Sequence, residues 1–115
     1  MQYMLIQYPP VSEMAGSAAD GGVPDEAAWQ TYTQILIDAG VLRGGNGLQP
    51  PSTATTVSQK DGKRVVQDGP FADSKAQLGG YYIIEVADLD AAIALAEQSP
   101  AVKNGSVEIR PVYAE

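Results

Sequence analysis

Histidine and cysteine, the side chains most often used as general base and thiol nucleophile, are both absent from this chain of 115 residues. Their absence excludes a thiol nucleophile, a disulfide framework, Cys-ligated metals and catalytic triads built on histidine. Acid–base chemistry is left to the carboxylates. Asp68 is the first candidate, because a carboxylate in a partly apolar pocket can act as a general acid or base.

Four other side chains could hold or orient a ligand beside such a carboxylate. Lys75, Arg43 and Arg110 could bind a carboxylate or a phenolate, and Tyr81 could donate a proton or a hydrogen bond. Each has an ordinary alternative reading. Lys75 and Arg43 would be solvated surface charges, and Arg110 would pair with a neighbouring glutamate.

Charge and motif content exclude several classes of partner. The chain carries 7 basic and 14 acidic side chains, a net charge of −7, which argues against nucleic-acid binding. The glycine-rich run 44–47 lacks the ending of a phosphate loop, and no calcium-loop spacing is present, so no cofactor and no metal are expected. We find neither a signal peptide nor an apolar run of the roughly 20 residues that span a bilayer, and therefore expect a cytoplasmic protein without membrane contact.

The elements that must position these side chains follow from periodicity and turn residues. The patterns predict strands at 3–8, 41–49, 53–60, 63–68, 81–86 and 106–112, and helices at 24–39 and 88–98. Residues 11–23 read as a long loop, either a plain surface loop or a lid over a pocket. The order β-α-β, hairpin, β-α-β favours a single α+β domain over 1–115, a ferredoxin-like sandwich with an inserted β-hairpin.

Local signals set the details of three of these elements. Asp61-Gly62 predicts a type I′ turn that pairs Lys60 with Lys63. Trp29 and Tyr32 recur at helical spacing, which favours core packing over a ligand-binding pair. For the second helix we expect an apolar stripe, which comprises Leu89, Ala92, Ile93 and Ala96.

The two faces of the main sheet receive different roles. We assign an apolar set to the helix side, namely Met4, Ile6, Tyr8, Tyr82, Ile84, Val86, Val107 and Ile109. The opposite face would then be mixed, with Tyr3, Leu5, Gln7, Tyr81, Ile83, Glu85, Glu108 and Arg110. Such a face suits a homodimer interface with a wet pocket at its edge, and the alternative is a solvated face with cross-strand ion pairs.

The run 68–75, Asp-Gly-Pro-Phe-Ala-Asp-Ser-Lys, is the least ordinary stretch. Spacing alone reads it as a structural turn that closes the hairpin. Together with Gln-Leu-Gly-Gly-Tyr-Tyr-Ile-Ile at 77–84, the start 1–5, the segment 48–55 and the tail 107–112, it closely resembles the DGPF family of YCII-related proteins. That resemblance implies a dimeric ferredoxin-like fold, a dimeric α+β barrel.

The resemblance says less about activity. In the wider group a histidine and an aspartate have been proposed as catalytic, and this chain has no histidine. Asp68 is the one residue of the matching motif that could keep an acid–base role. A related member resembles a small lyase acting on an aromatic compound. Members with this motif also accompany extracytoplasmic-function sigma factors, which implies a regulatory setting.

Three functions therefore compete. The first is a small-molecule-binding or regulatory accessory protein with a small anionic or aromatic ligand. The second is a cofactor-free lyase or isomerase that uses Asp68 with Tyr81 or an arginine. The third is a protein-interaction module that contacts a sigma factor.

Overall fold

The computed structural model describes residues 1–10, 26–71 and 77–113, and within them two helices and six strands follow the predicted order. The predicted loop at 11–23 lies outside the described residues. The elements are β1 (Gln2–Tyr8), α1 (Glu26–Asp38), β2 (Leu42–Gly47), η2 (Pro51–Thr53), β3 (Thr55–Lys60), β4 (Lys63–Asp68), β5 (Gly80–Glu85), α2 (Leu89–Ala96), η3 (Pro100–Val102) and β6 (Ser106–Pro111).

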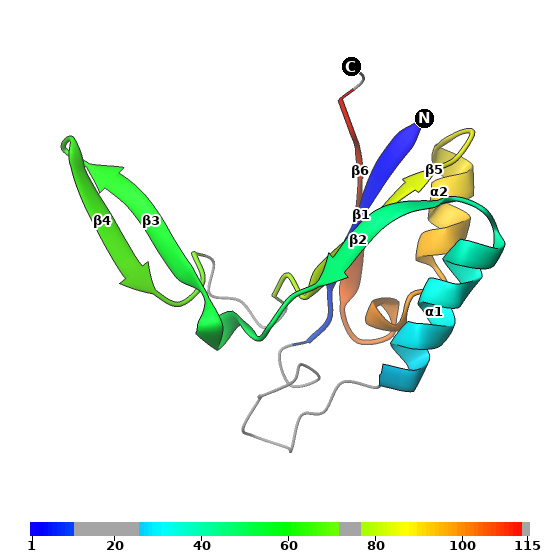
Figure 1. Ribbon diagram of the computed structural model, residues 1–115, viewed down its shortest axis with the longest axis horizontal. Helices are drawn as coiled ribbons and strands as arrows, with labels where there is room; N and C mark the ends of the chain where they lie inside the picture. Colours follow the sequence, from blue (N-terminus) through cyan, green and yellow to red (C-terminus); the bar gives the residue numbers. More distant parts are fainter. Residues whose placement is uncertain (11–25, 72–76, 114–115) are drawn as a thin grey trace.

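Four strands form the main sheet in the order β2-β5-β1-β6, and all neighbours are antiparallel. Both helices lie on one side of this sheet (Figure 1). The chain is therefore an α+β protein, compatible with the predicted ferredoxin-like sandwich. Its core lies between the two layers and consists of Tyr3, Leu5, Tyr32, Leu36, Ile84, Val86, Ala92 and Ala96.

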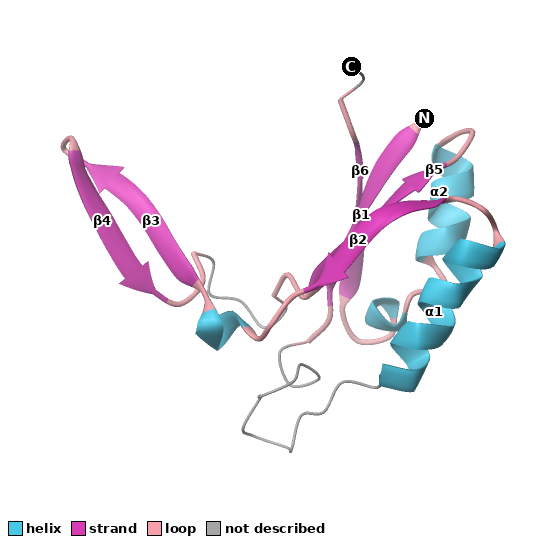
Figure 2. Cartoon of the chain, viewed as in Figure 1, coloured by secondary structure: helices cyan, strands magenta, loops and turns pink. Residues whose placement is uncertain are grey.

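The strands β3 and β4 form a separate two-stranded sheet that projects away from the main sheet (Figure 2). Lys60 pairs with Lys63 and Val57 with Val66, the register that a two-residue turn demands. Asp61 has φ 53° and Gly62 has φ 77°, the positive values of a type I′ turn. We refer to residues 55–68 as the arm.

The prediction of which β1 side chains face the helices is wrong. Tyr3 lies opposite Ile84 and Leu5 opposite Tyr82, so Tyr3, Leu5 and Gln7 face the helices. Met4, Ile6 and Tyr8 lie on the other face of the sheet, with Tyr81, Ile83, Glu85, Glu108 and Arg110. The error arose because β1 is apolar on both sides, and alternation alone does not say which side is inside.

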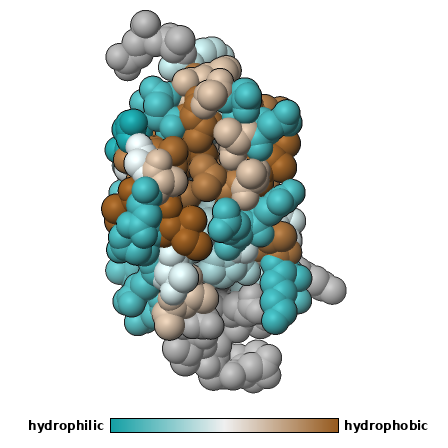
Figure 3. Space-filling view, turned by 90° about the vertical axis from the view of Figure 1, so that its right-hand side faces the viewer, coloured by the Kyte–Doolittle hydropathy of each residue, from teal (hydrophilic) through white to brown (hydrophobic). Residues whose placement is uncertain are grey.

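The apolar stripe predicted for α2 is only half buried. The side chain of Asp88 caps the helix by accepting a hydrogen bond from the backbone N–H of Ala91 at 2.9 Å. Ala92 and Ala96 pack into the core, whereas Leu89 and Ile93 are exposed. Apolar side chains accordingly lie between polar ones on the outer surface of the helix layer (Figure 3).

Within residues 1–10, 26–71 and 77–113, no helix has the length and apolar character needed to cross a membrane. The same residues hold no group of three or more acidic side chains placed to bind a metal ion.

Candidate functional site

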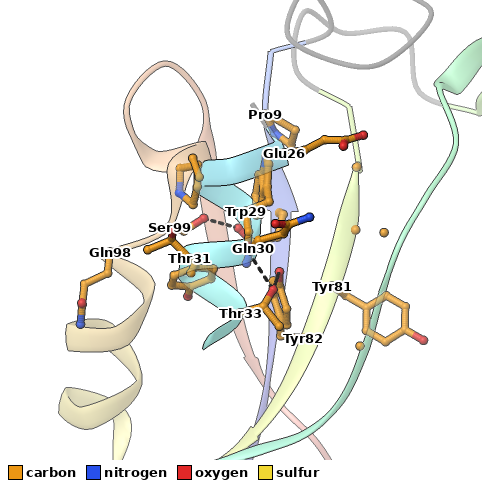
Figure 4. A pocket seen from close by; sticks show the side chains of 18 of the residues that line it. Pro9, Glu26, Trp29, Gln30, Thr31, Thr33, Tyr81, Tyr82, Gln98 and Ser99 are labelled. Atoms are coloured by element: carbon orange, nitrogen blue, oxygen red, sulfur yellow. Dashed lines mark hydrogen bonds between the residues drawn. The ribbon is translucent and has the colours of Figure 1, made fainter. Parts of the chain in front are cut away.

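A cavity of about 1340 Å³ opens between α1 and the β2–β5 edge of the sheet. Five of the elements contribute to its wall, and the close-up in Figure 4 labels several of these side chains. The lining residues include Gln7 from β1, Trp29 and Thr33 from α1, Gly45 and Asn46 from β2, Tyr81 and Tyr82 from β5, and Ser99 before η3.

Aromatic packing fixes the inner wall of the cavity. Tyr32 is 1 % exposed and meets both Trp29 and Tyr82 edge to face, with ring centroids 6.4 Å and 5.5 Å apart. Its hydroxyl donates a hydrogen bond of 3.0 Å to the carbonyl of Leu95 on α2. The burial predicted for Tyr32 is thus confirmed, while Trp29 is half-buried and lines the cavity.

Burial raises the pKa of the Tyr32 hydroxyl well above its usual range, and the neighbouring Tyr82 raises it further. A phenolate at this position would lose its hydration and face a second phenol. Tyr32 is therefore neutral at physiological pH, and it acts as a rigid support for the two aromatic side chains of the wall.

Two hydrogen-bonded pairs place polar atoms at the cavity. The hydroxyls of Thr33 and Tyr82 lie 2.8 Å apart, a contact that links helix to sheet (Figure 4). Deeper in the molecule, the Ser99 hydroxyl donates to the side-chain oxygen of Gln7 at 2.5 Å, and both residues are buried. Neutral hydroxyl and amide groups among aromatic rings are suited to binding a small polar aromatic molecule.

Glycines in β2 let this strand approach β5 closely. A Cβ at Gly45 would lie 2.5 Å from the carbonyl oxygen of Tyr81, whereas a Cβ at Gly44 would meet nothing within 4 Å. Any larger residue at position 45 would therefore collide with the backbone of β5, and only glycine fits there. The glycine-rich run 44–47 thus forms part of the cavity wall along β2.

Of the sequence-predicted site residues that the structure describes, Tyr81 is the one that lines this cavity. Its ring points away from that of Tyr82 (Figure 4), and its hydroxyl accepts a hydrogen bond of 3.1 Å from Asn46. Tyr81 thus borders the cavity from β5, with its side chain on the sheet face away from the helices.

The other predicted side chains lie elsewhere. Asp68 is exposed at the end of the arm, where its backbone pairs with Thr55. Arg43 is exposed on β2, with its guanidinium bonded to the carbonyls of Gly40 and Leu42. Arg110 forms an ion pair with Glu108 on the sheet face away from the helices, the ordinary alternative named for it. Lys75 lies outside the described residues.

Sequence reasoning missed Thr33 and Ser99 and placed Gln7 on the wrong face. A glutamine in the middle of an otherwise apolar strand was the available signal. Buried polar side chains need partners, so Gln7 implied a distant hydrogen-bonding group. The partner Ser99 is 92 positions away along the chain, beyond the reach of any local pattern.

Comparison with known proteins gives two results. A family model described as the YCII-related domain matches residues 1–115. An uncharacterised protein of Rhizobium meliloti (strain 1021) is 38 % identical over 78 residues, a match covering 66 % of this chain and 63 % of that protein. The chain therefore spans less than two thirds of the length of this relative.

Proposed function

Because the chain belongs to the family of YCII-related domain proteins, we propose that it is a small-molecule-binding accessory protein whose ligand enters the cavity beside α1. The supporting observation is the cavity itself, where Trp29 and Tyr82 offer aromatic surface and the paired hydroxyls of Thr33 and Tyr82 offer hydrogen-bonding atoms. The ligand class that fits is a small aromatic compound with a hydroxyl, amide or carboxyl group.

The charge of the cavity wall favours a largely neutral ligand. Among the described residues, Glu26 and Lys103 are the charged side chains of the wall, and its other polar side chains carry amides, hydroxyls or the Trp29 indole. A ligand carboxylate would find its cationic partner in Lys103. The anionic ligand expected from Arg43 and Arg110 would need a second site, since neither arginine lines this cavity.

We further propose that the protein acts as a homodimer through the sheet face away from the helices. The corrected orientation of β1 supports this, because it moves Met4, Ile6 and Tyr8 onto that face beside Ile83. The face is therefore more apolar than the sequence suggested, and apolar sheet faces are stabilised by packing against another layer.

A thermal-shift screen with small phenols, aromatic amides and aromatic acids tests the binding proposal, because a ligand of the folded state raises the melting temperature by mass action. We expect hits among phenols and amides. Tyr82→Phe should reduce the shift, and Tyr113→Phe is the matched control because Tyr113 is 98 % exposed. A screen without hits would contradict ligand binding.

The remaining functions are distinguished by the same compounds. Turnover of a hit that Asp68→Asn abolishes would support the lyase or isomerase. An empty screen together with a stable complex with an extracytoplasmic-function sigma factor would support the interaction module. The cytoplasmic location stays a prediction.

A further inference from the structure

Within the described residues, the arm is largely uncovered by the rest of the chain. Every residue of β4 is exposed, and so is every residue of β3 except Thr56. A two-stranded hairpin is at best marginally stable in water on its own. The arm therefore needs a surface to pack against.

The apolar residues of the arm lie mostly on one face. Val57 and Val66 are cross-strand partners, and they are 64 % and 54 % exposed. The next pair along the strands, Ser58 and Val65, points to the opposite face, because side chains alternate. The Val57–Val66 face is the one that contact with another surface would stabilise.

Charge identifies what kind of surface fits. The arm carries three basic and two acidic side chains, whereas the rest of the chain carries four basic and twelve acidic ones. Lys60 lies directly opposite Lys63 at the tip, an unfavourable like-charge pair in an isolated hairpin. A basic tip on an otherwise acidic protein is complementary to a second copy of that protein.

The extended shape of the chain also favours contact of the arm with a second copy. Its radius of gyration is 15.7 Å, against about 13 Å for a compact domain of this length. One face of the four-stranded sheet offers roughly 400 Å², from strand spacings of about 4.8 Å and lengths of about 20 Å. That is about half of the roughly 800 Å² per partner in a stable interface. In an exchange, each chain buries one face of its own arm and the surface covered by its partner's arm. At about 200 Å² each, these two areas supply the remainder.

We propose that the arm of each chain packs its Val57–Val66 face against the body of a second copy, so that two arms are exchanged about a two-fold axis. The inference rests on the homodimer of the proposed function and adds the segment that holds the two copies together. A closed two-fold exchange also covers the arm edges, which would otherwise be free to pair with other strands.

Analytical ultracentrifugation at micromolar concentration separates this inference from the homodimer itself. The double variant V57D/V66D should raise the dimer dissociation constant at least tenfold. The matched control S58D/V65D carries the same charges on the other face of the same arm and should change it less than threefold. Circular dichroism verifies that both variants are folded.

Each outcome has a distinct meaning. A wild-type chain that is monomeric overturns both the homodimer and the arm exchange. A wild-type dimer that tolerates V57D/V66D as well as it tolerates S58D/V65D overturns the arm exchange and leaves the homodimer standing. Ligand binding in the cavity is measured separately and does not depend on either result.

Single-cysteine variants provide a second readout, since the chain has no cysteine of its own. In the isolated chain Val66 is more exposed than Val65, 54 % against 38 %. A thiol at V66C should therefore react with a thiol reagent at least as fast as one at V65C. Arm exchange reverses this order in the dimer, and an unreversed order contradicts it.

Discussion

The hydroxyl of Ser99 and the side-chain oxygen of Gln7 lie 2.5 Å apart, and both residues line the cavity between α1 and the sheet. Both residues are buried. Because water does not reach these buried atoms, the two side chains satisfy each other's hydrogen bonding.

Ser99→Ala should destabilise the protein by about 1–3 kcal/mol, because it leaves a buried amide oxygen without this donor. The same variant removes the Ser99 oxygen that accepts from the Ala101 N–H at 3.2 Å. Urea unfolding measures the loss. The double variant Q7M/S99A should cost less than the sum of the single variants, and strict additivity would show that the pair is not coupled. Ser58→Ala on the exposed arm is the control and should be nearly neutral.

Gly45→Ala should destabilise the fold by about 2 kcal/mol or more, since its Cβ would collide with the Tyr81 carbonyl oxygen at 2.5 Å. Gly44→Ala is the matched control, because its Cβ would meet nothing within 4 Å. Thermal unfolding of the two variants compares them directly. Equal melting temperatures would contradict the close approach of β2 and β5.

Stability should fall as the pH rises above about 10, the value at which an unfolded tyrosine ionises. Tyr32 has its pKa raised in the folded state, so between the two values the folded chain holds one more proton than the unfolded chain. The free energy of unfolding then decreases by up to about 1.4 kcal/mol per pH unit. The stabilisation is complete below pH 10 and is lost at higher pH.

Tyr32→Phe isolates this effect. The variant loses the hydrogen bond to the Leu95 carbonyl, at a cost of about 1 kcal/mol at neutral pH. Denaturant unfolding between pH 8 and about 11 should then give a shallower decline than in the wild type. Parallel declines would mean that Tyr32 does not carry the pH dependence.

Asp68→Asn should leave ligand affinity within about twofold of wild type, since Asp68 is exposed on the arm and does not line the cavity. Isothermal titration with any hit of the screen measures this. A loss of affinity greater than tenfold would place Asp68 at the ligand and would favour the acid–base role suggested by the DGPF motif.

The sequence predicted those parts of the fold that depend on neighbouring residues. The arm register follows from Asp61-Gly62, and the start of α2 follows from Asp88, because turns and caps are local. The face of β1 could not be predicted, since both of its faces are apolar. Gln7 made the helix-facing side of β1 look polar, and its buried partner Ser99 lies 92 positions away.

The candidate site was less predictable than the fold. Tyr81 was singled out and lines the cavity, but its wall is completed by Thr33 and Tyr82, which meet only when α1 packs on the sheet. No spacing in the sequence joins a helical threonine to a strand tyrosine 49 positions away. Long-range packing, and not residue type, creates this site.

Trp29 provides the most direct test of ligand binding, because it is the single tryptophan of the chain and lines the cavity. Titration with a phenol or aromatic amide from the screen should change its fluorescence in a saturable way. Tyr82→Phe should raise the dissociation constant by about five- to tenfold, and Tyr113→Phe should leave it unchanged. A ligand that raises the melting temperature without altering Trp29 fluorescence would contradict the account, because it would bind elsewhere.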